Sequence, residues 1–397
     1  MTMRNVGDTH LFISKWHDEK HGPVSEHLKT LSLVDHHVHG VVVDNPSVES
    51  FSNMITESDR TPKSLNEALN SQVGLATRKW CAPLLDLPEF TEAEKYFARR
   101  IELGAEEVNK RLLRAAGIGH YFIETGYRGD EIHGISGMQK ITGAKIDEVV
   151  RLETVAEKLA LTGIHPRDFA TEYVRVLKDA TKSAVGIKSI VAYRIGLDFD
   201  PTRPSDKEVE QAAERWFTEI DKTKVARVTD PILMRFLLWS GSDLRLPFQF
   251  HIGYGDPDLY LNRCDPLLMT DFIRAMEKLE VPVLLLHTYP YQRNAGYLAQ
   301  MFRNVYLDVG LAINYSGARS VEIIGESIEL APFHKILFSS DAWGLPELTF
   351  LGSLLFRKGL GAILDKWVRD GDWSEKDAIK VADAIGVTNA LNAYKLK

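Results

Sequence analysis

Cysteine is scarce in this chain of 397 residues, which contains only Cys81 and Cys264. Two cysteines cannot build the disulfide framework of a small secreted domain, and such low usage is typical of a protein from a reducing cytosol. The sequence also lacks any apolar run near the ~20 residues that a membrane-spanning helix requires. Its first residues lack the apolar core of a signal peptide. We therefore expect a cytoplasmic protein with no membrane partner.

An excess of basic residues is also absent. The chain has 48 Lys and Arg against 55 Asp and Glu, a formal net charge of −7, whereas a nucleic-acid-binding protein presents a clustered basic face. We therefore predict a small-molecule substrate and no nucleic-acid partner. There are no internal repeats or low-complexity segments, and 44% of the residues are hydrophobic. This composition is typical of a globular protein with a large core.

What the sequence does contain is a series of short apolar runs separated by helical patterns. Eight runs are predicted as strands: 31–39, 119–125, 148–153, 184–194, 246–251, 281–287, 305–309 and 336–341. A helix is predicted over 205–221 because it opens with the capping-box pattern Ser205-Asp206-Lys207-Glu208. Apolar strands that alternate with helices are typical of a parallel sheet with crossover helices. A (β/α)8 TIM barrel of about 250 residues plus insertions fits this pattern.

The alternative architecture is an open, doubly wound sheet, which would place a glycine-rich phosphate-binding turn after the first strand. The sequence there, residues 40–43, reads Gly-Val-Val-Val and does not match. Residues 41–119 form a long stretch without strands and contain a second capping-box pattern, Thr91 to Glu94. We predict a single domain, 1–397, with 41–119 as a helical insertion that covers the site. A separate small domain is less favoured, because no linker sets the segment apart.

The first strand ends in His36-His37-Val38-His39. Side chains alternate between faces along a strand, so His37 and His39 share a face with Asp35, while His36 points the other way and is expected to pack. Two imidazoles on one face can hold a metal ion. Histidines at this spacing are also common on protein surfaces. A solvated role is expected for the histidines of the polar, helical lead-in at residues 1–30, which are His10, His17, His21 and His27.

Later apolar runs end in further residues that bind metals or transfer protons. In a barrel, the carboxyl ends of all strands converge on one face. The residues at these ends are Glu124, Glu153, Lys188, His251, His287 and Asp341. Burying several ionisable groups costs several kcal/mol unless they are paired or hold a metal. A metal site is therefore favoured over a set of isolated core residues.

This set of residues resembles the motifs of the amidohydrolase superfamily, in particular its amidohydrolase 2 branch. The motif residues are Asp35, His37, His39, His251, His287, Ser340 and Asp341. The segments 249–253, 263–268, 289–298, 304–308 and 339–342 are similar to the amidohydrolase-like half of FluG and nodulin-type proteins. In that group this half can be fused to a glutamine-synthetase-like half. The resemblance covers the chain from about residue 30 to its end.

The resemblance implies one or two divalent metal ions, most often Zn2+. His37, His39 and His251 would be ligands, and Asp341 would both ligate the metal and act as the general base. His287 would ligate the metal or hydrogen-bond the water and the developing oxyanion. A bound metal lowers the pKa of its water toward neutrality, which makes that water a nucleophile.

Lys188 determines how many ions the site would hold. It resembles the fourth-strand lysine that binuclear members carboxylate to bridge two metals. Otherwise a lysine inside an apolar strand is expected to pair with an acid such as Glu153 or Glu124, or to bind a substrate carboxylate. The branch that this chain resembles usually has a single metal. Both the metal count and the state of Lys188 stay open.

The remaining candidates would bind substrate. They are Arg151, Glu153, Arg194, Tyr254, Arg263 and Tyr291. Arg151 and Glu153 share one face of the third strand, and Arg194 ends the fourth. Arginine suits carboxylate recognition, and a loop salt bridge is the alternative for each one.

The sequence thus predicts a metal-dependent hydrolase that cleaves an amide-type C–N bond of a small, carboxylate-bearing substrate through a metal-activated water. The alternative is a non-oxidative decarboxylase of the same branch, which would release carbon dioxide instead of an amine. A non-catalytic barrel that serves as a binding module ranks last, because the histidine pair and Asp341 are all present. The resemblance leaves a homo-oligomer open.

Overall fold

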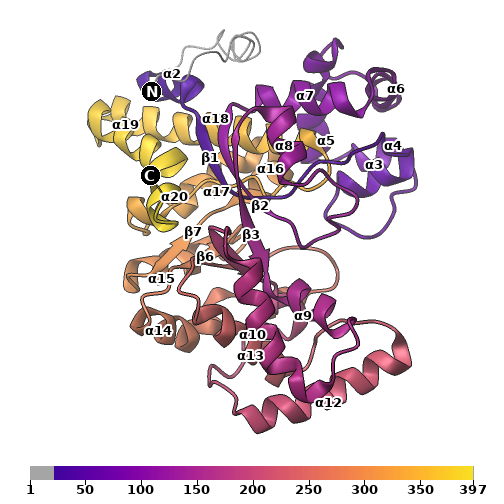
Figure 1. The fold of residues 1–397 in the computed structure, drawn as a ribbon. Coiled ribbons are helices and arrows are strands. Elements are labelled where there is room, and N and C mark those ends of the chain that lie inside the picture. The colour runs from indigo at the N-terminus through magenta and orange to yellow at the C-terminus, as the bar shows by residue number, and fades with distance from the viewer. Residues whose placement is uncertain (1–21, 397) are drawn as a thin grey trace.

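The computed structural model describes residues 22–396 and is built around one parallel sheet (Figure 1). The seven strands of this sheet lie in sequence order, β1-β2-β3-β4-β5-β6-β7. They are β1 (Leu33–Val38), β2 (Ile118–Glu124), β3 (Lys145–Arg151), β4 (Gly186–Ser189), β5 (Phe248–His251), β6 (Val283–Leu286) and β7 (Val305–Leu307). Parallel neighbours need crossover connections, and helices provide them throughout.

The helices before β2 are α2 (Pro23–Thr30), α3 (Val48–Met54), α4 (Leu65–Ala68), α5 (Gln72–Ala76), α6 (Ala93–Leu103) and α7 (Ala105–Ala115). Between β2 and β5 lie α8 (Ile135–Thr142), α9 (Leu152–Ala160), α10 (Phe169–Ala180), α11 (Val191–Arg194), α12 (Asp206–Thr223) and α13 (Pro231–Ser242). The rest are α14 (Thr270–Lys278), α15 (Gln292–Met301), α16 (Gly310–Ser316), α17 (Ser320–Ser327), α18 (Pro346–Asp370), α19 (Glu375–Asp383) and α20 (Asn389–Ala393).

The segment predicted as an eighth strand, 336–341, is not a regular strand and makes only an isolated bridge to β7. Its backbone nevertheless reaches both edges of the sheet. The Leu337 N–H donates to the Leu307 carbonyl of β7 (2.9 Å), and the Asp341 N–H donates to the His37 carbonyl of β1 (3.0 Å). The sheet is therefore curled so that its first and last strands approach one another, which is consistent with a TIM-barrel fold.

A small apolar cluster marks the interior of the curled sheet. Its strand residues are Val34 of β1, Phe122 of β2, Val149 of β3 and Leu284 of β6, joined by Leu337. Strands this far apart in the sheet order share a cluster only if the sheet curls around it. Tyr394, just after α20, also belongs to the cluster, and its hydroxyl accepts a hydrogen bond from Gln249 Nε2 (2.6 Å). The end of the chain thus fills the interior of the sheet.

Several sequence-based expectations need correction at the strand ends. Glu153 lies in α9 and not on β3, because β3 ends at Arg151. Arg194 ends the helical turn α11, beyond the end of β4. The register of β1 against β2 shifts between Asp35 and Val38, so strict alternation of side chains does not hold there.

The two predicted capping boxes differ in outcome. The box at Ser205 is confirmed, with the Ser205 side chain accepting from the Glu208 N–H and the Glu208 carboxylate accepting from the Ser205 N–H. The prediction at Thr91 is wrong, because Glu92 is the N-cap of α6 and no side chain caps it. His27, expected to be solvated, lies 2.6 Å from Asp383 Oδ1 through its Nε2. His10, His17 and His21 fall outside the described residues.

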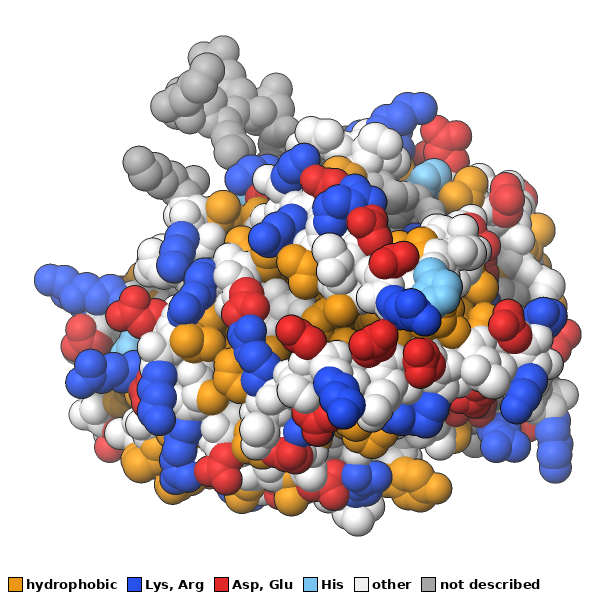
Figure 2. Space-filling model, turned by 60° about the horizontal axis from the view of Figure 1, so that its bottom comes forward, with side chains coloured by type: hydrophobic (Ala, Val, Ile, Leu, Met, Phe, Trp, Pro, Cys, Tyr) orange, Lys and Arg blue, Asp and Glu red, His pale blue; other side chains and the backbone are white. Residues whose placement is uncertain are grey.

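The outer surface mixes both signs of charge. On the face drawn in Figure 2, Lys and Arg side chains are interspersed with Asp and Glu. None of the helices within residues 22–396 combines the length and the apolar character that crossing a membrane requires.

Candidate metal centre

Three side chains that can bind a metal meet where β1 ends. They are His37, His39 and Asp341, and their potential ligand atoms lie within 4.8 Å of one another. We call these three residues the metal-ligand cluster. His37 Nε2 is 2.8 Å from Asp341 Oδ1, and His39 Nε2 is 3.8 Å from the same oxygen. Two imidazoles and a carboxylate are a donor set that divalent first-row metals accept.

The main chain determines which ring nitrogen of His39 carries the hydrogen. His39 Nδ1 is 3.0 Å from the carbonyl oxygen of Glu124, which can only accept. Nδ1 is therefore the donor, and Nε2 turns a lone pair toward Asp341. Burial lowers the pKa of His39 to about 4, and burial together with Lys188 lowers the pKa of His37 to about 3. Both rings are neutral at neutral pH, which is the form that binds metals.

Two residues of the site have left-handed backbones, Asp341 with φ 48° and His287 with φ 38°. Such conformations cost non-glycine residues about 1–3 kcal/mol each and cluster at functional sites. Asp308, the residue directly after β7, supports this geometry because its Oδ1 accepts a hydrogen bond from the His287 N–H (2.9 Å). His287 Nε2 then lies 3.4 Å from Asp341 Oδ2. Burial alone would raise the pKa of Asp341, but His287 and His37 outweigh it and hold that pKa well below its usual range.

His36 takes no part in this cluster. Its Nε2 lies 2.9 Å from Asp308 Oδ2, and its Nδ1 lies 3.2 Å from the Tyr394 hydroxyl. It therefore connects the interior of the sheet to the carboxylate that supports His287.

His251 and His287 stand beside the three-residue cluster, with their ring centroids 4.3 Å apart. His251 Nε2 is buried without a hydrogen-bond partner among the described residues, and His287 Nε2, also buried, has there only the long 3.4 Å approach to Asp341 Oδ2. Buried polar atoms are almost always satisfied. These unpartnered nitrogens therefore fit a site that takes up a metal or a substrate.

Lys188 is 3% exposed, and its Nζ lies 2.9 Å from His37 Nε2. The two acids proposed as its partners are bonded elsewhere. Glu124 binds the Arg151 guanidinium, with Arg151 Nε at 2.9 Å. Glu153 Oε1 accepts from the Ser189 hydroxyl (2.5 Å). Burial lowers the pKa of Lys188, and the amine faces the metal-ligand cluster.

A cavity of about 440 Å3 opens onto these residues. Its lining includes His39, Lys188, His251 and Asp341 from the strand ends. Two of the predicted substrate-binding residues, Arg151 and Arg194, also line it. The last residues of α3 and the loop after it, within 53–59, form another part of the wall.

The other predicted substrate-binding residues lie elsewhere. Glu153 is fully buried and bonds Ser189, the last residue of β4. Tyr254 lines an adjoining cavity, also of about 440 Å3. Arg263 pairs with Asp198, and the Tyr291 hydroxyl donates to a backbone carbonyl. Neither Arg263 nor Tyr291 lines the cavity at the metal-ligand cluster.

Sequence reasoning missed several residues of the cavity wall, above all Glu57 and Asp256. Glu57 lies in a loop with no periodic pattern, and its only signal was the expectation that residues 41–119 cover the site. Asp256 lies in the loop after β5, from which Tyr254 was predicted instead.

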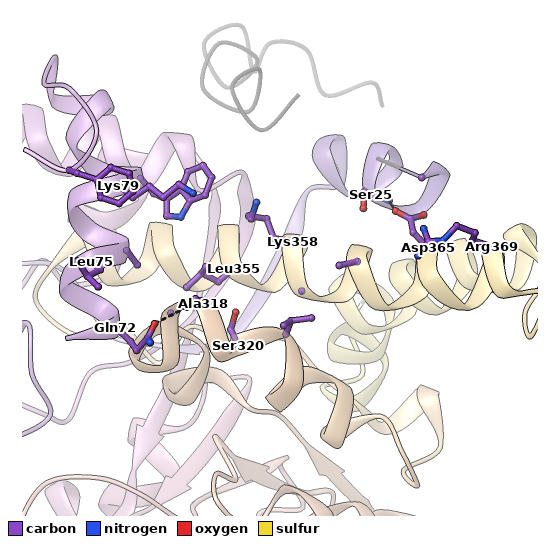
Figure 3. Close-up of a pocket in the computed structure, with 18 residues that line it drawn as sticks. Ser25, Gln72, Leu75, Lys79, Ala318, Ser320, Leu355, Lys358, Asp365 and Arg369 are labelled. Carbon is purple, nitrogen blue, oxygen red and sulfur yellow. Dashed lines mark hydrogen bonds between the residues drawn. The ribbon is translucent and has the colours of Figure 1, made fainter. Parts of the chain in front are cut away.

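A larger cavity, of about 710 Å3, lies against α18 (Figure 3). Its lining includes Gln72, Lys79, Lys358 and Asp365, and it contains neither a histidine nor a strand-end residue. Asp365 already accepts hydrogen bonds from the backbone at the start of α2. We therefore place the candidate centre at the strand ends and not in this cavity.

Comparison with known proteins agrees with this geometry. Residues 165–396 match the sequence profile of the family described as amidohydrolase. The chain is 30% identical over 289 residues to protein fluG of Emericella nidulans; the match covers 65% of this chain and 33% of that protein. The chain thus spans about a third of the length of this curated relative.

Solved structures show the same fold. A protein of Lactobacillus casei ATCC 334, provisionally described as a metal-dependent hydrolase, is 28% identical with a TM-score of 0.82 over 94% of this chain and 98% of its own. A uronate isomerase of Bacillus halodurans C-125 has a TM-score of 0.62 at 13% identity, covering 99% of this chain and 98% of its own. At that identity, the second match supports the fold alone.

Proposed function

Because this chain belongs to the amidohydrolase family, we propose that it is a metal-dependent hydrolase that cleaves an amide-type C–N bond of a small, carboxylate-bearing substrate. The observation that carries the proposal is the cluster of His37, His39 and Asp341 at the wall of a cavity. The Lactobacillus casei protein, similar along nearly the whole chain, supports the same class of enzyme.

His37, His39 and Asp341 would hold a divalent metal ion, with His251 and Lys188 beside them. We propose zinc, since two neutral imidazoles and a carboxylate are typical of catalytic zinc sites. When bound, such an ion polarises a carbonyl and lowers the pKa of water. The contact between Lys188 Nζ and His37 Nε2 supports a single ion, whereas a second ion would require Lys188 to be carboxylated.

The chain itself supplies the proton transfers. Asp341 would accept a proton from the attacking water and pass it to the leaving nitrogen. His287 Nε2 is buried and lies 3.4 Å from Asp341 Oδ2, with no shorter hydrogen bond in the described residues. It would donate a hydrogen bond to the oxyanion that develops on the substrate carbonyl.

Arg194 supports a carboxylate on the substrate. Its Nη2 donates to Glu157 Oε1 (2.9 Å), but Nε and Nη1 are buried and have no partner among the described residues. Arg194 lines the cavity, and charged donors left unpaired there would be satisfied by a carboxylate. Arg151 is less suited to this role because Glu124 already occupies its guanidinium.

Metal analysis of the purified protein tests the proposed centre. We expect about one metal equivalent per chain, lost in the His37→Ala, His39→Ala double variant, because three protein ligands are needed to hold such an ion. His334→Ala removes an exposed histidine and serves as the control that keeps its metal. Two equivalents that fall in Lys188→Ala would show a bridging lysine instead. A wild-type protein that binds no metal after reconstitution would contradict the proposal.

Product analysis separates the two reactions. With carboxylate-bearing amides, the hydrolase releases an amine, whereas the decarboxylase alternative releases carbon dioxide. Release of carbon dioxide without release of an amine would contradict the hydrolase proposal and support the decarboxylase.

A further inference from the structure

In the cavity at the metal-ligand cluster, the arginines of the wall have acidic partners, whereas two of its acids have no basic partner within the described part of the chain. Each of its four arginines is paired with an acid. The pairs are Arg128 with Glu131, Arg151 with Glu124, Arg194 with Glu157, and Arg227 with Asp258. Arginine charge in this cavity is thus largely neutralised by the protein itself.

Glu57 and Asp256 differ from the arginines in this respect. Both line the cavity at the metal-ligand cluster and the adjoining cavity, so they stand at the boundary between the two. No ion pair in residues 22–396 involves either of them, although Lys188 contributes a field at Glu57 and Arg227 contributes one at Asp256. Glu57 hydrogen-bonds the Tyr315 hydroxyl, and Asp256 Oδ1 accepts from the Asp258 N–H (2.9 Å). These carboxyls therefore have hydrogen bonds but no cationic partner in contact.

Three tyrosines stand next to the two acids. The Tyr193 hydroxyl accepts from the Asp256 N–H (3.3 Å), and Tyr315 bonds Glu57. Tyr254 meets Tyr315 edge to face, with ring centroids 6.0 Å apart. Aromatic faces beside carboxylates attract cations through both charge and the ring quadrupole.

A further observation points to a ligand in the same cavity. The Tyr193 ring lies 4.4 Å from the His251 ring, and His251 Nε2 is buried without a partner in the described residues. His251 is 5% exposed and lines the cavity. Burial, Asp341 and Asp256 raise the pKa of Glu57 to about 8. At neutral pH this carboxyl is therefore largely protonated until a cation beside it favours the ionised form.

We propose that Glu57, Asp256 and the tyrosines 193, 254 and 315 form a subsite for a protonated amine of the substrate. We call it the amine subsite. The inference rests on the proposed function, because it names the chemical class of the molecule that the same cavity would hydrolyse. A substrate with its carboxylate at Arg194 and its ammonium group at Glu57 would use both kinds of unsatisfied group in the wall.

Calorimetric titration with two probes of matched shape tests the amine subsite in the metal-loaded protein. n-Butylammonium carries the charge, and n-butanol lacks it. We expect the cation to bind about tenfold more tightly, because it adds charge-assisted hydrogen bonds and aromatic contacts. Glu57→Gln and Asp256→Asn should each reduce the affinity for the cation toward that for the alcohol.

Asp372→Asn is the control. Asp372 is an exposed acid that lines neither of the two cavities, so this variant should bind both probes as the wild type does. Equal affinities for the two probes in the wild type would overturn the proposal. So would preference for the cation that survives both Glu57→Gln and Asp256→Asn, since the amine would then be bound elsewhere, for example on the metal. Unchanged metal content verifies that each variant is folded.

The titration also separates this inference from the proposed function. Binding is measured without turnover. A protein that prefers the cation but hydrolyses no amide would support the amine subsite and contradict the proposed hydrolase activity. A hydrolase that binds both probes equally would lose the amine subsite alone.

Discussion

Asp341→Asn is expected to lower kcat/KM by about 10³-fold, the scale on which general bases act. Asparagine has nearly the same shape but cannot accept the proton of the attacking water. The fold should survive, because the main chain of residue 341 bonds the His37 carbonyl through its N–H and not through its side chain.

The measurement is steady-state hydrolysis of an amide that the wild type cleaves, with metal content determined on the same sample. Loss of activity with metal retained would isolate the role of Asp341 as a base from its role as a ligand. Asp370→Asn, which alters an acid paired with Lys366 at the end of α18, should leave activity unchanged. Full activity in Asp341→Asn would contradict the assignment of the base.

Glu347→Gln is expected to reduce the free energy of unfolding by about 3–5 kcal/mol, because it leaves a buried charge without its partner. Arg100 of α6 and Glu347 of α18 are both 0% exposed, with Arg100 Nε 2.8 Å from Glu347 Oε1. The Tyr96 hydroxyl donates to the same oxygen (3.0 Å). Among the described residues Arg100 Nη1 lacks a partner and the only ion pair of Arg100 is with Glu347, so no second acid is in place to take over.

Chemical denaturation of the wild type and of Glu347→Gln measures this difference in the free energy of unfolding. The control is Glu172→Gln, which breaks an ion pair with Arg175, a residue whose side chain is 61% exposed. Exposed pairs contribute about 0–1 kcal/mol. If the two variants lose similar stability, the buried pair does not anchor α6 to α18 as we infer.

Most strands could be predicted because strands buried on both faces form continuous apolar runs. The failure at 336–341 has a local cause. The Ser340 N–H donates to the Asp35 carboxylate (3.0 Å). A side chain thus takes a backbone donor that a regular ladder would use, and no periodic pattern records this.

The cluster of His37, His39 and Asp341 could be predicted because barrel topology brings strand ends together, whatever the loops do. Loop residues follow no such rule. Arg263 was proposed from its position after β5, yet Asp198 binds it. Glu57 reaches the cavity from a segment without strands, and only the folded structure shows it there.

The hydrogen bond from Ser340 to Asp35 joins residues 305 positions apart, and this spacing has a consequence for biosynthesis. When β1 has emerged from the ribosome, the growing chain contains both imidazoles. It still lacks the carboxylate and the segment that closes the sheet. Metal uptake should therefore follow translation of Asp341. Tyr394, which fills the interior of the sheet, is made later still, so the surroundings of the candidate centre are complete only after α20 has emerged from the ribosome.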